Sequence, residues 1–438
     1  MRKRNPQEMK DSGIEWIGEY PEDWGLAKLK FLSNVKRGAS PRPIDNPKYF
    51  DNEGEYSWVR ISDVTASNEY LYSTEQTLSP LGASKSVKLE PGELILSIAA
   101  SVGKPVINKI KCCIHDGFIY FNNLKLDTKF TFYLFKSGEP YKGLGKLGTQ
   151  LNLNSESVGS IVSPVPPKPE QKAIATFLDR KTQAIDRLIE KKQQLIEKLK
   201  EKRQALITQA VTKGLPSEAA AKAGLNPGAP MKDSGIEWLG EIPEHWDLVK
   251  FKHSVRLVNK KSEEADFIVA LENVESWTGK YLESDSDYKP SGVAFKKGDV
   301  LFGKLRPYLA KGYLAKKPGN AIGDFYVFRG RKYNSIYLLM IVLSEIFIDV
   351  VDSSTYGAKM PRASWDFIGE LKLPVPTLKE QKYIIKQVQA ILKSDGKVNS
   401  KITKQIKRLK EYRQSLISTA VTGKIDVRDE IEQPELAE

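Results

Sequence analysis

The sequence predicts an α+β fold in which two mixed α/β domains are separated by a pair of long antiparallel coiled-coil helices, with a pseudo-twofold internal repeat. Three observations support this prediction. The phrase MKDSGIEWIGEYPEDW, which begins at Met9, returns as MKDSGIEWLGEIPEHW at Met231. A second pair of segments repeats at a shorter offset and has the period of a long helix. Short apolar runs broken by Gly, Pro, Asn and Ser fill the chain between the repeats.

The first long helix is predicted at residues 166–214. After the proline-rich stretch SPVPPKPEQ, no Gly or Pro occurs before Gly214. One seven-residue series, interrupted only by Lys192, has the spacing of a coiled-coil seam. Its apolar members are Leu178, Ile185, Leu199 and Leu206. About 40 residues at about 1.5 Å each give a helix of roughly 60 Å, and its single apolar stripe requires a partner.

The partner helix lies in the same chain, at residues 377–424. The strings PVPTLKEQKYII and LKEYRQSLISTAVTGK repeat PVPPKPEQKAIA and LKEKRQALITQAVTKG at an offset of 210, which gives both helices the same length. Asp395 and Gly396 interrupt the second helix and predict a weak point or a kink there.

The repeats divide the chain into six segments. They are a first globular domain at 1–165, the first helix at 166–214, a linker at 215–230, a second globular domain at 231–376, the second helix at 377–424 and a C-terminal tail at 425–438. Faint echoes such as PGELILS and KGDVLFG suggest that both domains share one scaffold with different contact residues. The opening phrase itself, with its Gly and Pro breakers, is interpreted as an extended, anchored loop.

Composition narrows the class of protein. The formal charge of +13 and the pI near 9.3 favour a polyanionic partner, although a generic basic protein is an equal alternative on charge alone. The adjacent Cys112 and Cys113 are interpreted as small strand-core residues, because Cys-Cys-x-His has too few ligands at the wrong spacing for structural zinc. No signal peptide and no run of 18 apolar residues is found, so the expected location is cytoplasmic, with no membrane.

The ordered set of repeated strings resembles the specificity subunit of type I restriction–modification systems. The strings are DSGIEWIGEYPEDW and DSGIEWLGEIPEHW, PPKPEQ and PTLKEQ, KEKRQALITQAVT and KEYRQSLISTAVT, and FGKLRPYL from Phe302 to Leu309. Each alone is weak, but the set occurs twice in order. The resemblance covers nearly the whole chain, except the connector and the tail after about Asp426.

The resemblance implies that each globular domain is a target-recognition domain that reads one half of an asymmetric bipartite sequence in double-stranded DNA. The helices would dock two adenine-methyltransferase (M) subunits, and two restriction (R) subunits could join. On this view the chain is a non-catalytic subunit with no cofactor and no metal of its own. S-adenosylmethionine would belong to the methyltransferase partner, and ATP and Mg to a restriction partner.

The residues lead to a compatible expectation without the resemblance. Two like helices offer equivalent surfaces to two copies of one partner around a pseudo-twofold axis. Two unlike domains suit a two-part, asymmetric ligand, and DNA combines negative charge with divisible sequence. The paired helices would then set the unread spacer, at most about 18 base pairs for roughly 60 Å.

Base reading requires Arg or Lys for guanine, Asn or Gln for adenine, and adaptable Ser or Thr hydroxyls on loops. Candidates in the first domain are Lys36, Arg37, Ser40, Arg42, Arg60, Ser101, Lys104, Gln150 and Asn152. Candidates in the second are Lys260, Lys304, Arg306, Tyr308, Lys311, Lys359 and Arg362. Arg306, Lys359 and Arg362 are favoured because they lie where the two halves differ. Solvated surface charge is the alternative for each.

No catalytic motif is legible. GLGKLG at 143–148 matches a dinucleotide-binding string but lacks the following helix, so a flexible, DNA-facing loop is favoured. Glu170, Gln171, Glu380 and Gln381 are interpreted as capping or buried polar packing at the helix starts rather than as acids or bases. Trp16, Trp24, Trp238 and Trp246 are expected to fasten each domain to the helices rather than to stack on bases. The remaining functional alternatives are a self-sufficient DNA nuclease or methyltransferase, and a coiled-coil adaptor protein.

Overall fold

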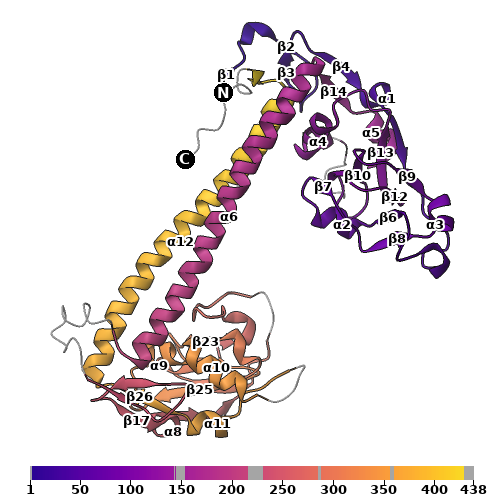
Figure 1. Ribbon diagram of the computed structural model, residues 1–438. Helices are drawn as coiled ribbons and strands as arrows, with labels where there is room; N and C mark the ends of the chain where they lie inside the picture. The colour runs from indigo at the N-terminus through magenta and orange to yellow at the C-terminus, as the bar shows by residue number, and fades with distance from the viewer. Residues whose placement is uncertain are drawn as a thin grey trace. The chain divides into compact units, whose positions relative to one another are not determined.

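A computed structural model describes residues 2–142, 144, 153–215, 230–284, 288–355 and 360–428 (Figure 1). The chain forms two compact units. The first contains Met1–Lys191 and Lys404–Glu438, and the second contains Lys192–Thr403. Each unit therefore combines one globular domain with part of both long helices, α6 (Lys168–Thr212) and α12 (Leu378–Val421).

Two sheets form the globular part of the first unit. The larger has the order β5-β13-β10-β11-β7, and the smaller has the order β8-β6-β12-β9. Strands of the larger sheet are β5 (Asn34–Arg37), β7 (Tyr70–Leu71), β10 (Leu94–Ser97), β11 (Pro105–Asn108) and β13 (Phe118–Asn122). Strands of the smaller are β6 (Tyr56–Val59), β8 (Gln76–Leu78), β9 (Val87–Leu89) and β12 (Cys112–Ile114). The helices are α1 (Leu29–Leu32), α2 (Ile61–Ala66), α3 (Pro80–Ser84), α4 (Thr128–Lys136) and α5 (Ser155–Gly159).

The second unit repeats this plan. Its sheets have the orders β18-β25-β22-β23 and β19-β21-β24-β20. The first sheet contains β18 (Val255–Val258), β22 (Val300–Gly303), β23 (Gly312–Leu314) and β25 (Phe325–Gly330). The second contains β19 (Lys261–Ser262), β20 (Ile268–Val269), β21 (Gly292–Phe295) and β24 (Gly319–Ala321). The helices are α8 (Phe251–Ser254), α9 (Ser335–Val342), α10 (Glu345–Ser353) and α11 (Trp365–Glu370).

The strand pairings confirm that the two domains share one scaffold. In each unit a four-strand core runs β5-β13-β10-β11 or β18-β25-β22-β23, with antiparallel neighbours throughout. In each smaller sheet the central strand, β12 or β24, has one parallel and one antiparallel neighbour. The units differ at the edges, where the first adds β7 and β8 and the second adds β19.

The repeated opening phrase is a hairpin in both units, not the extended loop that the sequence predicted. β2 (Met9–Asp11) pairs with β3 (Glu19–Pro21), and β15 (Met231–Asp233) pairs with β16 (Glu241–Pro243). Three-residue strands are too short to show alternation, which is why the pattern was hidden. Two further short pairs close the domains, β4 (Gly25–Lys28) with β14 (Val162–Val165) and β17 (Asp247–Lys250) with β26 (Lys372–Val375).

Two segments that are far apart in the sequence pair within the first unit. β1 (Arg2–Lys3) pairs with β27 (Ile425–Asp426), inside the segment that the sequence treated as a tail. Val427 is buried, and Asp426 is bound by the Arg428 guanidinium, whose hydrogen bond outweighs partial burial and lowers the pKa of that carboxyl to about 2. Residues 429–438 lie outside the described range, as does most of the predicted linker at 215–230.

α6 and α12 are antiparallel partners. In the first unit, Arg413 near the end of α12 binds Asp186 in the first half of α6 at 3.1 Å. In the second unit, Ile207 and Val211 near the end of α6 share a core with Ile384 at the start of α12. Leu188 and Leu195, which lie outside the predicted seven-residue series of α6, are 43% and 46% exposed.

α12 is one continuous helix through Asp395 and Gly396, where the sequence predicted a weak point or a kink. A Cβ at Gly396 would meet no atom within 4 Å, and an exposed glycine costs a long helix only about 1 kcal/mol. Packing along the rest of the helix outweighs that cost. Among the described residues, no helix is both long and apolar enough to cross a membrane.

Candidate nucleic-acid interface

The turn between β12 and β13 organises one edge of the first domain. The register places Val59, the last residue of β6, beside Ile114, and Arg37, the last residue of β5, beside Ile119. Ser97, at the end of β10, pairs with Phe118. The segments that follow these strands therefore converge on residues 115–117, which form the turn.

Asp116 in this turn collects three of the predicted DNA-binding residues. Arg42 Nη2 lies 2.8 Å from Asp116 Oδ2, Ser40 Oγ donates to Oδ1 at 3.0 Å, and Arg37 Nε donates to the Asp116 carbonyl at 2.5 Å. Burial would raise the pKa of Asp116, but the Ser40 hydrogen bond and the two guanidinium groups outweigh it and lower the pKa. Asp116 thus holds the three donors at one edge, Ser40 and Arg42 through its carboxylate and Arg37 through its backbone carbonyl.

The neighbouring His115 supports this turn rather than offering a free imidazole. Its Nδ1 accepts the Gly117 amide at 2.8 Å, and its ring lies 4.5 Å from the Phe118 ring. Burial is the largest influence and lowers the pKa of His115, despite the opposing charge of Asp116. A neutral ring is consistent with its place between Trp58 and Phe118.

The loop 98–104, between β10 and β11, lies next to the same turn. The Ile98 amide donates to the Gly117 carbonyl at 2.9 Å. Ser101 Oγ is 2.6 Å from Thr65 Oγ1, and Lys104 Nζ donates to the Thr65 carbonyl at 2.6 Å. Thr65 belongs to α2, which begins directly after the exposed Arg60. Arg60, Ser101 and Lys104 are therefore held in one region by α2.

The remaining candidates of the first domain do not join this cluster. Lys36 precedes Arg37 on β5, so its side chain projects from the opposite face of the sheet. Gln150 and Asn152 lie outside the described residues, as does GLGKLG apart from Leu144.

The second domain builds the corresponding edge around Asp324, in the turn between β24 and β25. Arg362 Nη2 lies 3.1 Å from Asp324 Oδ2, and Lys304 Nζ lies 3.7 Å from Oδ1. Lys304 also donates its amide to the Asp324 carbonyl at 2.8 Å. The two domains thus use the same device, an aspartate in the equivalent turn that gathers basic side chains.

The loop 304–311 presents the other candidates. Arg306 and Tyr308 are exposed, and Arg306 has φ +51, a backbone conformation that costs free energy in a residue with a Cβ. Its amide donates to the Pro361 carbonyl at 2.8 Å, and Leu305 forms a β-bridge with Arg362. The strained loop is thereby fastened to the segment that carries Arg362.

Two further candidates are less available, and one is not described. Lys311 Nζ donates to the Leu271 carbonyl at 2.7 Å, and burial lowers its pKa, so it is engaged within the domain. Lys260 is exposed just after β18, whose Val258 pairs with Val327 near the start of β25. Lys359 lies outside the described residues.

Asp116 and Asp324 were missing from the sequence prediction. A search for donors to bases and phosphates discards carboxylates, although carboxylates can also accept from cytosine N4. The signal was nevertheless present, because HDGFIYF and GDFYVF each place an aspartate within two residues of the start of an aromatic strand.

The repeated Glu–Gln pairs hold each domain on its following helix, as the capping and packing interpretation predicted. Trp24 Nε1 donates to Glu170 Oε2 at 2.9 Å, and Trp246 Nε1 donates to Glu380 Oε1 at 3.0 Å. Both indoles are buried, which confirms their predicted fastening role.

Gln171 and Gln381 each bind the N-terminus of a shorter helix in the same unit, α4 and α9 respectively. Gln171 Oε1 accepts the Asp127 amide at 2.6 Å, and Gln381 Oε1 accepts the Asn334 amide at 2.7 Å. Asp127 and Asn334 are the N-caps of α4 and α9, which are therefore equivalent helices.

A second pair of equivalent glutamines, Gln204 and Gln414, lies near the C-terminal ends of the long helices. Gln414 of α12 donates to the Ser137 carbonyl in the first unit, and Gln204 of α6 donates to the Trp277 carbonyl in the second at 3.5 Å. Each domain is thus held by the start of one helix and the end of the other. These contacts account for the repetition of the strings at both helix ends.

Known proteins resemble the chain in sequence. The profile of the type I restriction modification DNA specificity domain matches residues 21–198. The specificity subunit of the type I restriction enzyme EcoDI from Escherichia coli is 22% identical over 435 residues, covering 96% of this chain and 92% of that protein. The MjaVIII specificity subunit from Methanocaldococcus jannaschii is 24% identical over 446 residues, covering 93% and 94%.

A solved structure shares the fold. A chain from a study of complex assembly and conformational transition of the type I R-M system superposes with a TM-score of 0.68 at 14% identity, covering 93% of this chain and 99% of that one. The repeat, the two basic edges and the similarity along nearly the full length agree. Along nearly its full length the chain is thus similar to type I restriction–modification specificity subunits, and residues 21–198 match the DNA specificity domain of that family.

Proposed function

We propose that this chain selects the DNA target of a type I restriction–modification enzyme, with each domain reading one half of a bipartite sequence. The observation that carries the proposal is the pair of equivalent basic edges around Asp116 and Asp324. Exposed ion pairs contribute little to stability, so these aspartates orient guanidinium groups that can exchange the carboxylate for DNA at small cost. Different side chains on one scaffold would read different half-sites.

The chain would act without chemistry of its own. The proposal assigns methyl transfer to two methyltransferase subunits docked on the repeated helices, and cleavage to restriction subunits where they are present. Repetition of the contacts at the helix ends supports two equivalent docking surfaces. Among the described residues, no group of three or more His, Cys, Asp or Glu is placed to hold a metal ion.

The test compares Arg42→Ala with Arg362→Ala in the complex with methyltransferase subunits. Each arginine is exposed and paired with the turn aspartate of its own domain. Loss of one base contact costs about 1–3 kcal/mol, so each variant should relax methylation at one half-site by about tenfold or more. Arg306→Ala should affect the same half-site as Arg362→Ala and leave assembly intact.

Lys297→Ala is the matched control. Lys297 is an exposed lysine in the turn before β22, whereas Lys304 directly follows that strand, so the two lysines lie at opposite ends of β22. The complex that contains Lys297→Ala should methylate the same DNA sites as the complex that contains the unaltered chain. The proposal fails if Arg42→Ala and Arg362→Ala relax the same half-site, or if neither changes specificity while assembly is normal. A salt-sensitive gel shift with mixed DNA separates this function from a protein-only adaptor.

A further inference from the structure

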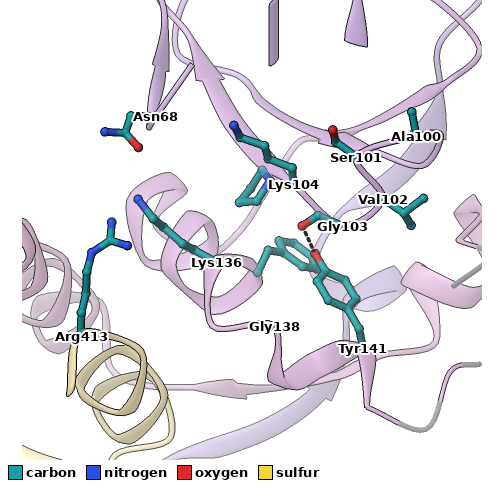
Figure 2. Close-up of a pocket in the computed structure, with 12 residues that line it drawn as sticks. Asn68, Ala100, Ser101, Val102, Gly103, Lys104, Lys136, Gly138, Tyr141 and Arg413 are labelled. Atoms are coloured by element: carbon teal, nitrogen blue, oxygen red, sulfur yellow. Dashed lines mark hydrogen bonds between the residues drawn. The ribbon is translucent and has the colours of Figure 1, made fainter. Parts of the chain in front are cut away.

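A hollow of about 540 Å³ lies in the first unit, where the loop 98–104, the end of α4 and α12 come together (Figure 2). Its charged lining residues are all basic, namely Lys104, Lys136 and Arg413. Asn68, Ser101 and Tyr141 add polar groups. The volume is far too small for a duplex but is sufficient for a phosphate-bearing small molecule or a single backbone phosphate.

Lys136 supplies an amine that lacks an acidic partner. Its Nζ lies 4.9 Å from the centre of the Phe132 ring, and no hydrogen bond or ion pair of this amine is found within the described part of the chain. Burial and the nearby Arg413 lower the pKa of Lys136 to about 8, and the more distant Glu69 and Asp186 offset only part of this effect. A bound anion would compensate the buried charge.

Arg413 faces the same hollow from α12. One end of its guanidinium binds Asp186 at 3.1 Å, while its buried Nε has no hydrogen-bond partner. An unmet buried donor is costly, so an acceptor is expected there. Figure 2 shows the Arg413 and Lys136 side chains approaching the hollow from different helices.

The loop 98–104 forms the third wall of the hollow and has a defined backbone conformation. Ala100 and Gly103 have φ +51 and +83, and the Tyr141 hydroxyl donates to the Gly103 carbonyl at 2.9 Å. A Cβ on Gly103 would lie 2.8 Å from the Tyr141 ring. The loop is therefore fixed against Tyr141, with Ser101 and Lys104 on the side of the hollow.

The second unit did not keep this arrangement. The equivalent of Lys136, counted from the N-caps of α4 and α9, is the buried Leu343. Arg203, which corresponds to Arg413, also has a buried Nε without a hydrogen-bond partner. Burial lowers the pKa of Arg203, and the nearby carboxylate of Glu275 opposes that effect. Among the described residues, the pairing of a lysine at this position of α4 with an arginine of the long helix is thus found in the first unit and not in the second.

We propose that the hollow bounded by Lys104, Lys136 and Arg413 binds a phosphate group. The Lys136 amine and the Arg413 Nε supply donors that have no partner of their own among the described residues and that match the acceptor oxygens of phosphate. Lys104 and Ser101, each already bonded to Thr65, add a positive charge and a hydroxyl beside them. The group can belong to a free phosphate compound or to the backbone of DNA bound by the first domain. The second source rests on the proposed function, whereas the first does not.

The first experiment measures inorganic phosphate and sulfate binding to the full chain by calorimetry. Lys136→Leu copies the residue that the second unit uses at this position, so the variant should remain folded. Its phosphate affinity should fall by about tenfold or more, as expected for loss of a charge-assisted hydrogen bond. Arg413→Gln should weaken phosphate to a similar extent, whereas Arg203→Gln, its counterpart in the second unit, should not.

Sulfate provides a pH test because its charge does not change across the range. Its affinity should fall as the pH rises through about 8, where Lys136 loses its proton, with Lys104, Arg413, Glu69 and Asp186 as the other charged groups near this amine. Lys136→Leu should remove most of this dependence. The free-anion form of the proposal is overturned if the unaltered chain and Lys136→Leu bind each anion equally well. It is also overturned if neither chain binds phosphate or sulfate.

The second experiment separates the two sources. Affinity for a target duplex is measured at several salt concentrations, and loss of one phosphate contact should reduce the salt slope by about one. A reduced slope in Lys136→Leu identifies a DNA phosphate. An unchanged slope with weakened inorganic phosphate identifies a free compound. If neither quantity changes, the hollow is not a phosphate site. Absence of all duplex binding would refute the proposed function but leave the calorimetric result valid.

Discussion

Glu170 and Glu380 occupy equivalent places, yet their surroundings differ. Besides Trp24, Glu170 binds the guanidinium of Arg4, and both side chains of this ion pair are buried. Glu380 pairs instead with His245 at 3.2 Å, and His245 is 49% exposed. The same carboxylate is therefore part of a buried ion pair in one unit and of a solvent-accessible pair in the other.

This difference predicts unequal costs for one substitution. Glu170→Ala leaves the Arg4 charge buried, which costs about 3–5 kcal/mol. Glu380→Ala leaves chiefly an unpaired indole N–H, which costs about 1–3 kcal/mol. Urea unfolding of the two variants measures both values. Equal losses would show that Arg4 finds water or another partner. Arg4→Met with Glu170→Gln should recover part of the loss, because the uncompensated charge is then removed.

Cys112 and Cys113 are confirmed as strand-core residues. They are adjacent on β12, so their side chains point to opposite faces and enter two different apolar clusters. Burial is the main cause that raises the pKa of Cys112 to about 12 and that of Cys113 to about 11. Neither thiol is therefore ionised near neutral pH.

These pKa values predict slow reaction with a thiol reagent. In the folded chain at pH 8 neither cysteine should react within minutes, whereas both should react at once in denaturant, because the thiolate is the reactive form. A raised pKa means that the folded chain retains protons that the unfolded chain releases. The stability associated with these thiols is thus full below about pH 9 and is lost as the pH rises towards 11–12. Rapid labelling at pH 8 would indicate local opening of β12.

For single residues, the amino-acid type was a useful guide to the hydrogen-bond donors of the candidate interface. It did not indicate which groups orient those donors. Arg37, Ser40 and Arg42 were predicted from their chemistry, and Asp116 brings them together. Lys311 was predicted on the same grounds but is used inside the domain. A sequence reports the donors that are present, whereas the acceptor that each one meets depends on strand register.

Among the elements, the long helices were the most predictable. A run without Gly or Pro and a seven-residue period place them well, and the observed bounds are Lys168–Thr212 and Leu378–Val421. The short hairpins of the opening phrase were not predictable, because three residues cannot establish a period. The β1–β27 pair was hidden for another reason, since its strands come from opposite ends of the chain.

Substitution by alanine is expected to have opposite effects at Gly396, inside α12, and at Gly423, just after it. Gly396 is in the helix interior with free space around a new Cβ, so Gly396→Ala should stabilise the chain by about 1 kcal/mol. Gly423 follows the helix with φ +74, and a Cβ would lie 2.5 Å from the Pro21 ring. Gly423→Ala should therefore destabilise the first unit. Thermal unfolding distinguishes the two. No gain from Gly396→Ala would indicate that the backbone there is strained or locally open.

For the whole molecule, the internal repeat was the decisive pattern. It predicted two domains on one scaffold, and the shared strand orders bear this out. It could not predict which side chains differ at equivalent positions, such as Lys136 in one unit and Leu343 in the other. The contacts at the helix ends, by contrast, are alike in the two units.

The last prediction concerns the role of the paired helices in setting the distance between half-sites. Insertion of one heptad into both α6 and α12 preserves the seam and adds about 10 Å, or about three base pairs of unread spacer. Mapping of methylated sites should then show both half-sites unchanged and their spacing increased. Insertion into α6 alone is the control, because it shifts one seam against the other and should abolish assembly. If the double insertion leaves the spacer unchanged, features other than helix length determine the separation of the half-sites.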